Sequence, residues 1–374
     1  MNILDYLDIN GSLTFRESPL NEVDNVIFST LAYLRMDGFV NIDGSISKTL
    51  PQLLDDLEKT GYDTSTFVYD PMKLLRKAAS TARYQQVTAG YYISLNNSEQ
   101  QIQFAAVTFS YDACSSYIAF RGTDNTLTGW REDFNLSCQD STPGQIAAAD
   151  YINYVSGKTG DSFIVGGHSK GGNFAVYGSA FCEAHIRDSR ICLIYSNDGP
   201  GFSQKTASTA SYNRILPKLI KIIPESSYIG ILLSSKARSR IITSSARGAG
   251  QHNPYSWNVL GNTFESADSR SFSSLLVDSA VSTWVNTLEN EEKKLIINSL
   301  FDTLESSGFE TLRDMKAKKI QTAKALLKGA AQLKPEHRKQ LLDAFGKFFK
   351  SGKTRIPAEI MKAISGEGNL FDRP

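Results

Sequence analysis

A serine flanked by glycines stands at an abrupt change of pattern near the middle of the chain. The segment FIVGGHSKGGNFAVYGSAF, residues 163–181, begins as an apolar run and resumes after the serine as a helical pattern. Residues 167–171, GHSKG, fit the G-x-S-x-G motif, which between a strand and a helix is typical of a nucleophile elbow. An ordinary glycine-rich turn is the alternative. We favour the elbow, which predicts that Ser169 is exposed for nucleophilic chemistry.

A serine nucleophile needs a general base, and the chain has four histidines. His168 adjoins the serine on the elbow, where its side chain should point away from the nucleophile. His185 lies near the end of the following helix, about four turns from Ser169 and too far to reach it. His337 lies in a basic segment near the C-terminus. His252, in AGQHNPYSW, follows the last predicted strand, where the chain order serine, acid, histidine places the base. His252 is therefore the expected base.

Two carboxylates are candidates for the acid that orients the base. Asp198, in YSNDGPGF, follows the strand after the elbow helix and lies in a turn fixed by two glycines and a proline. Glu225, in KIIPESS, follows the next strand, which is the commoner position for this group. Asp198 could instead cap a turn, and Glu225 could be solvated. We favour Asp198 and keep Glu225 as the alternative.

Acyl transfer also needs an oxyanion hole, which binds the charge that develops on the carbonyl oxygen. One donor is expected to be the backbone N–H of Lys170, the residue after the nucleophile. The other is expected from the loop after an earlier strand in YIAFRGTDNTLTGWREDF, residues 117–134. There Thr123 offers both its N–H and its hydroxyl, although an ordinary strand-end turn would give the same pattern.

The elements around these residues indicate an α/β fold. Residues 1–85 read as mostly helical, and residues 86–260 as strands that begin to alternate with helices. Apolar strands in alternation with helices predict a largely parallel sheet that is covered on both faces. The elbow helix is expected from about residue 170 to 186.

The C-terminal part, residues 261–374, is predicted to be a separate helical extension that begins at a Ser-rich stretch. Its residues 313–362 contain 14 Lys and Arg against four acids, a net charge of +10, so the rest of the chain carries −9. Such basic helices could lie on an anionic membrane, as amphipathic helices do. They could equally pack against the acidic body of the protein, and we slightly favour this second arrangement.

Several functional classes are excluded by composition and spacing. The 40 Lys and Arg balance 39 Asp and Glu, and no stacking pattern favours nucleic acid. SGKT occurs twice, but the glycine that a P-loop needs is missing both times. No metal-ligand spacing is present, so no cofactor or metal is expected. The N-terminus lacks a secretory pattern, and four scattered cysteines are read as mostly buried thiols, which predicts a cytoplasmic protein.

Three of these motifs together resemble class 3 (fungal-type) lipases of the α/β-hydrolase superfamily. They are AFRGTDNTLTGWREDF, VGGHSKGGNFAVYGSA and QHNPYSW. The segments NEVDNVIFSTLAYL, GHSKGGNFAVY, SNDGPGF and SSYIGILL resemble more closely a bacterial, lipase-class-3-like family. The resemblance covers about residues 20–260 and not the C-terminal extension.

The resemblance implies an α/β-hydrolase fold and a serine hydrolase of acyl esters or lipids. It implies Ser169 as nucleophile, His252 as base, and Thr123 with Lys170 as the oxyanion hole. The chain departs from fungal-type lipases in two places. Lys170 replaces an apolar residue, which hints at a substrate other than neutral triglyceride, and Glu225 replaces an Asp. The competing hypothesis is a catalytically silent hydrolase fold that binds partners through its basic tail.

Overall fold

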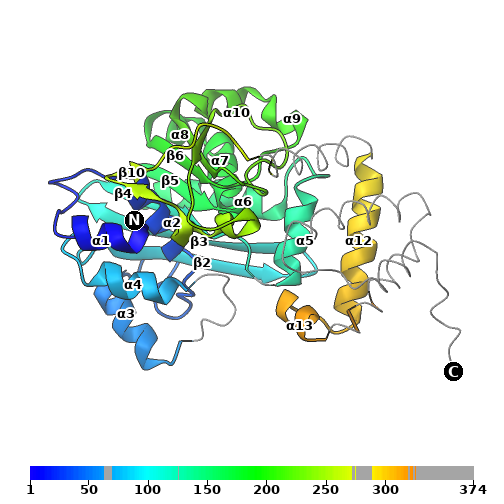
Figure 1. The fold of residues 1–374 in the computed structure, drawn as a ribbon, viewed down its shortest axis with the longest axis horizontal. Coiled ribbons are helices and arrows are strands. Elements are labelled where there is room, and N and C mark those ends of the chain that lie inside the picture. The colour runs from blue at the N-terminus through cyan, green and yellow to red at the C-terminus, as the bar shows by residue number, and fades with distance from the viewer. Residues whose placement is uncertain are drawn as a thin grey trace, which may run out of the picture.

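The structure is a computed structural model whose fold is shown in Figure 1. The residues that it describes are 1–62, 70–124, 126–271, 274, 289–318, 321–322 and 325. Most of the basic segment 313–362, with His337, therefore lies outside the described residues. Among the described helices, none combines the length and the apolar character needed to span a membrane.

The centre of the molecule is one eight-stranded sheet whose strands follow the order of the chain. Strands β1 to β4 pair antiparallel, and β4 to β8 pair parallel. The largely parallel α/β sheet predicted from the sequence is confirmed. The strands are β1 (Lys48–Thr49), β2 (Thr88–Asn97), β3 (Ile102–Asp112), β4 (Ser115–Phe120), β5 (Ser162–His168), β6 (Ile191–Asn197), β7 (Leu219–Pro224) and β8 (Ser239–Ile242), with a separate ribbon of β9 (Val259–Leu260) and β10 (Thr263–Phe264).

Helices occupy both faces of this sheet, as Figure 1 shows. The predicted elbow helix ends earlier than expected, and a second short helix follows it. The described helices are α1 (Ile3–Asn10), α2 (Glu22–Leu31), α3 (Leu50–Lys59), α4 (Pro71–Ala79), α5 (Leu127–Asn135), α6 (Pro143–Ser156), α7 (Lys170–Phe181), α8 (Ala184–Ser189), α9 (Gln204–Ala207), α10 (Ala210–Ile215), α12 (Asn290–Ser306) and α13 (Leu312–Ala317), with 3-10 turns η1 (Leu216–Lys218), η2 (Gly248–His252) and η3 (Pro254–Ser256).

Two hydrophobic cores hold the layers together. One lies between the N-terminal helices α1 to α4 and one face of the sheet, and the other between that sheet's second face and α6, α7 and α10. Helix α2 is the most deeply placed of the N-terminal helices, because every residue from Val23 to Leu31 is buried. Its start is fixed by a capping box between Asn21 and Asp24. Helix α2 is therefore a well-anchored part of the core beside the sheet.

Helices α12 and α13 pack on the outer side of α5, at one end of the sheet (Figure 1). The Arg131 side chain of α5 is buried there and pairs with Asp302 at 2.8 Å and Glu305 at 3.3 Å, both on α12. Phe134 and Phe301 add a ring contact across the same interface. The division of the chain at residue 260 remains a prediction.

All four cysteines are free thiols. Cys138 and Cys182 are buried as expected, whereas Cys114 and Cys192 are exposed.

Candidate active site

Ser169 lies at the corner between β5 and α7, where the strand ends and the helix begins one residue later. Its backbone has φ 58° and ψ −131°, a conformation that side-chain-bearing residues rarely adopt. The Ser169 N–H donates to the carbonyl of Asn197 at 2.9 Å, which ties the corner to the neighbouring strand β6. The side chain is partly exposed. This is the geometry that the elbow motif predicts.

The glycines of the motif are required by close backbone contacts. A Cβ atom on Gly167 would lie 2.3 Å from the carbonyl of Gly171, and one on Gly171 would lie 2.1 Å from the carbonyl of Phe120. Neither neighbour is a flexible side chain that could move aside. The elbow therefore packs against both its own helix and the end of β4.

Substituting Gly171→Ala is expected to destabilise the protein by about 3 kcal/mol, at the upper end of the range for overpacking. The reason is the 2.1 Å contact of the new Cβ with the Phe120 carbonyl oxygen. The free energy of unfolding from urea titration measures the effect. Gly160→Ala is the matched control, because its Cβ meets no atom within 4 Å. Equal stabilities of the two variants would contradict the prediction.

His252 lies at the end of η2 and contacts the nucleophile and a carboxylate through its two ring nitrogens. Its Nε2 is 3.0 Å from the Ser169 Oγ, and its Nδ1 is 2.6 Å from the Asp198 Oδ2. The Asp198 side chain is fully buried, whereas His252 is 23% exposed. Because a carboxylate only accepts, Nδ1 carries a proton, which leaves Nε2 of the neutral ring to accept one from Ser169.

The Asp198 carboxylate is held by donors on the loop after β7. Its other oxygen, Oδ1, accepts from the Ser227 hydroxyl and from the Gly230 N–H at 3.1 Å. Asp198 itself has φ 48°, so it is a second strained position beside the nucleophile. These contacts fix the carboxylate so that Oδ2 is left facing His252.

Glu225, the alternative acid, does not contact His252 in the structure. Its carboxylate accepts from the Nε2 of Gln251 at 3.2 Å. Gln251 also accepts from the Ser226 N–H at 2.7 Å, so it anchors the turn that carries His252. Glu225 thus contacts Gln251, the residue before His252, and supports the loop that carries the histidine.

His168 is fully buried and points away from Ser169, as expected. Its Nε2 donates to the backbone carbonyl of His252 at 2.8 Å, and its Nδ1 is 3.1 Å from the hydroxyl of Tyr33. Burial, with a smaller contribution from His252, lowers the pKa of His168 well below its usual value, so the ring is neutral. His168 therefore fixes the backbone of the base.

Helix α2 and the residues just after it contact the residues that hold Ser169 and His252 in place. Asn25 forms a reciprocal amide pair with Asn197, whose carbonyl accepts from the nucleophile's N–H. Two residues after the end of α2, Tyr33 reaches His168. The loop after β4 lies against the same residues, because a Cβ on Gly122 would meet the Tyr33 hydroxyl oxygen at 2.1 Å.

Thr123 follows that glycine, on the loop predicted to supply an oxyanion donor. Its hydroxyl donates to the Asp133 Oδ2 at 2.6 Å. Burial raises the pKa of Asp133 to about 6, although the Lys170 charge and the Thr123 hydrogen bond lower it. When Asp133 is ionised it takes the Thr123 hydroxyl hydrogen, and the role of Thr123 as an oxyanion donor stays a prediction.

The Lys170 backbone begins α7, where the first N–H groups of a helix have no intrahelical partner. Its side chain is fully buried in an ion pair with Glu132, so it does not face the position of a substrate. The Lys170 charge is neutralised inside the protein, so it gives no reason to expect a substrate other than neutral triglyceride, and the nature of the substrate stays a prediction.

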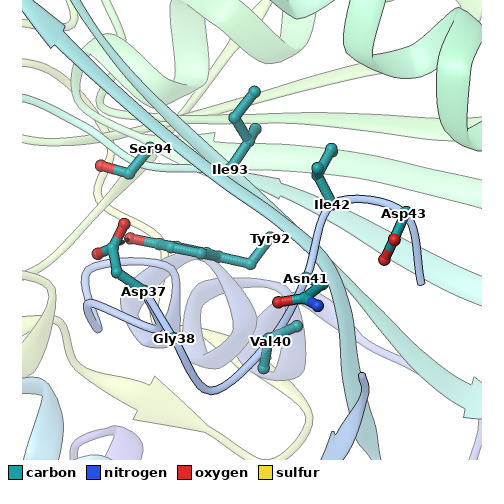
Figure 2. A pocket seen from close by; sticks show the side chains of 9 residues that line it. All are labelled: Asp37, Gly38, Val40, Asn41, Ile42, Asp43, Tyr92, Ile93 and Ser94. Atoms are coloured by element: carbon teal, nitrogen blue, oxygen red, sulfur yellow. Dashed lines mark hydrogen bonds between the residues drawn. The ribbon is translucent and has the colours of Figure 1, made fainter. Parts of the chain in front are cut away.

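A cavity of about 430 Å³ is lined by residues of β2 and of the segment that follows α2. Ser94 of β2, which lines this cavity, pairs with Ala105 of β3. The Ala105 carbonyl accepts from the N–H of Arg121, the residue that follows β4. Because β3 and β4 lie between β2 and β5, Ser94 is three inter-strand spacings, about 14 Å, from β5. In Figure 2, Tyr92 extends toward Asp37, to which its hydroxyl donates at 3.3 Å. The lining residues are Asp37, Gly38, Val40, Asn41, Ile42, Asp43, Tyr92, Ile93 and Ser94.

The described residues contain no group of three His, Cys, Asp or Glu side chains arranged to hold a metal ion. The same part of the chain places the Ser169 Oγ, the His252 ring and the Asp198 carboxylate in one hydrogen-bonded path.

Comparison with known protein families gives a match to a family model described as Mbeg1-like. It covers residues 78–302, more than half of the chain and all of the sheet except the short β1. The chain belongs to the Mbeg1-like family. This makes it a lipase-like α/β-hydrolase, in agreement with the resemblance noted from the sequence motifs.

Among solved structures, the Mbeg1-like chain is similar to the crystal structure of M37 lipase. The TM-score is 0.35 and the sequence identity 12%, over 57% of this chain and 73% of that one. No curated protein matches the Mbeg1-like chain.

Several residues of the Mbeg1-like site were not predicted from the sequence. The contacts of Ser227 and Gly230 with Asp198 lie in SSYIGILL, a segment noted only for its resemblance. Glu132 and Asp133 lie in GWREDF, where two adjacent acids on one helix, close to the Thr123 loop, could have indicated a role in the site. Tyr33 gave no signal, because an aromatic residue in an apolar helix is usually part of a core.

Proposed function

We propose that the protein is a serine hydrolase that cleaves carboxylic acyl esters, of lipase, esterase or phospholipase type. Ser169 is the nucleophile, His252 the base and Asp198 the orienting acid. The observation that carries the proposal is the continuous hydrogen-bonded path from the Ser169 Oγ through both nitrogens of His252 to Asp198, at 3.0 and 2.6 Å. Family membership supports a hydrolase of lipase type.

The reaction has two steps that use the same groups. Ser169 Oγ attacks the ester carbonyl carbon while His252 Nε2 takes its proton. The backbone N–H groups of Thr123 and Lys170 donate to the oxyanion, and the imidazolium then protonates the leaving alcohol. Water next attacks the acyl-enzyme as His252 takes its proton, and that proton returns to Ser169 when the acid leaves. Asp198 stabilises each imidazolium.

The proposal is tested by labelling purified protein with a fluorophosphonate, which reacts only with activated serines. We expect a covalent adduct on the peptide that contains Ser169, located by mass spectrometry, and hydrolysis of p-nitrophenyl butyrate. Ser169→Ala and His252→Ala should both abolish labelling. A folded wild-type protein that neither labels nor hydrolyses the ester would overturn the proposal and favour a binding protein.

The lipid nature of the substrate, the cytoplasmic location and contact of residues 313–362 with a membrane are further parts of the proposal. Pelleting with anionic phosphatidylserine vesicles, with and without residues 313–362, tests the last part. Binding that is lost with the segment and weakened by salt would support an electrostatic membrane contact. Absence of binding at low salt would contradict it.

A further inference from the structure

Lys170 places a full positive charge in the protein interior, directly after the nucleophile. Its Nζ donates to the Gln103 Oε1 at 2.8 Å, to the Glu132 Oε2 at 3.1 Å and to the Gly129 carbonyl at 3.4 Å. Both charged side chains of the pair are 0% exposed. The three donors of the ammonium group are therefore all used, and two of them go to α5.

Glu132 is the centre of this cluster. Besides Lys170, it accepts from the Gln103 N–H of β3 at 3.0 Å and from the Gly144 N–H at the start of α6 at 2.8 Å. A Cβ on Gly144 would lie 2.4 Å from the Glu132 Oε1, so the carboxylate has little room to move. Glu132 thus joins α5 to β3, α6 and α7.

The next residue of α5 holds the other side of the oxyanion hole. Asp133 accepts from the Thr123 hydroxyl, and the methyl group of Thr123 lies 3.0 Å from where a Cβ on Gly129 would be. On its outer side, α5 is anchored to α12 through Arg131. One helix is therefore tied to both expected oxyanion donors by consecutive acidic residues.

We propose that the buried ion pair between Lys170 and Glu132 is a positioning device, which fixes the N–H of Lys170 relative to the Thr123 loop. This inference rests on the proposed function. A buried ion pair contributes little net stability, because desolvation offsets the attraction. A geometric role accounts for it better, since misplacing one group by about 1 Å costs about 10²-fold in rate.

The test measures kcat and KM for p-nitrophenyl butyrate and the inhibition constant of phenylboronic acid, whose tetrahedral serine adduct places an oxygen in the oxyanion hole. The variants are Lys170→Met, Glu132→Gln and the double variant. We expect each single variant to lower kcat about 10- to 100-fold with KM changed less than about 3-fold. The boronic acid should bind more weakly by a similar factor.

The double variant and a matched control separate positioning from stability. If the pair acts as one unit, the double variant loses about as much kcat as either single variant. It also leaves no unpaired buried charge, so it folds even where a single variant does not. Arg83→Met breaks a second buried ion pair, with Asp24 in the first turn of α2, and should lower the unfolding free energy without changing kcat per labelled serine.

The outcomes distinguish this inference from the proposed function. Wild-type protein that binds no boronic acid and hydrolyses no ester would overturn the proposed function. Active wild type whose Lys170 and Glu132 variants keep kcat and boronic acid affinity, or lose only stability as Arg83→Met does, would overturn the positioning role alone.

Discussion

Replacing Asp198 with asparagine is expected to lower kcat about 10⁴-fold, the size of effect seen when the acid of a Ser-His-Asp site becomes an amide. Asp198 Oδ2 accepts from the Nδ1 of His252 at 2.6 Å and so holds the proton on that nitrogen. An amide nitrogen at this position would donate instead, which favours the ring form with its proton on Nε2. That form has no lone pair to accept the proton of Ser169.

The measurement is kcat for p-nitrophenyl butyrate, normalised to the concentration of folded protein. Glu225→Gln is the matched control, because it makes the same chemical change on the carboxylate that contacts Gln251 and not His252. We expect Glu225→Gln to retain kcat within about 3-fold, as for a change that leaves the proton path intact. Reversed effects of the two variants would assign the acid to Glu225 instead.

Ser169 and His252 could be predicted from the sequence alone. The serine follows from a local glycine motif, and the histidine follows by elimination among the histidines of the chain. Glycine is required at 167 and 171 by contacts of less than 3 Å within the turn and with the end of β4, and this requirement leaves a short motif in the sequence. Of the four histidines, only His252 follows the last predicted strand, and the structure places it beside Ser169. The parallel sheet followed from alternating apolar strands and helices.

The supporting residues could not be found in this way because their contacts join distant parts of the chain. Asn25 meets Asn197 across 172 residues, and Tyr33 meets His168 across 135. Within α2, Asn25 looks like a polar residue on a helix surface until the structure shows that every side is covered. The burial of Lys170 could not be predicted for a similar reason, since a lysine is almost never fully buried unless it is paired and its partner Glu132 lies 38 residues away.

Replacing Thr123 with valine is expected to lower kcat about 10²-fold, the lower end of the loss for an oxyanion-hole donor. Valine keeps the shape but loses the hydroxyl that donates to Asp133, so the N–H of residue 123 is no longer held in place. The measurement is kcat and KM for p-nitrophenyl butyrate at pH 8. Thr123→Ser restores the hydroxyl and should return kcat to within about 3-fold of wild type; equal losses in both variants would show that packing of the methyl group is responsible.

Asp133 makes this side of the oxyanion hole depend on pH. Because burial raises the pKa of Asp133 to about 6, its carboxyl is largely neutral at pH 5 and ionised at pH 8. When ionised, it takes the hydroxyl hydrogen of Thr123 and places a negative charge near the oxyanion. Asp133→Asn stays neutral, and its amide can donate to the Thr123 oxygen, which frees the hydroxyl hydrogen for the substrate.

The ratio of kcat for Asp133→Asn to kcat for wild type should therefore rise as pH increases through about 6 and be level on either side. Taking the ratio removes every pH effect that both proteins share. A ratio independent of pH from 5 to 8 would show that Asp133 does not change charge in this range. A ratio that falls with pH would show that the carboxylate is needed to hold Thr123, and that the hydroxyl hydrogen contributes less to the oxyanion than the placement of the loop.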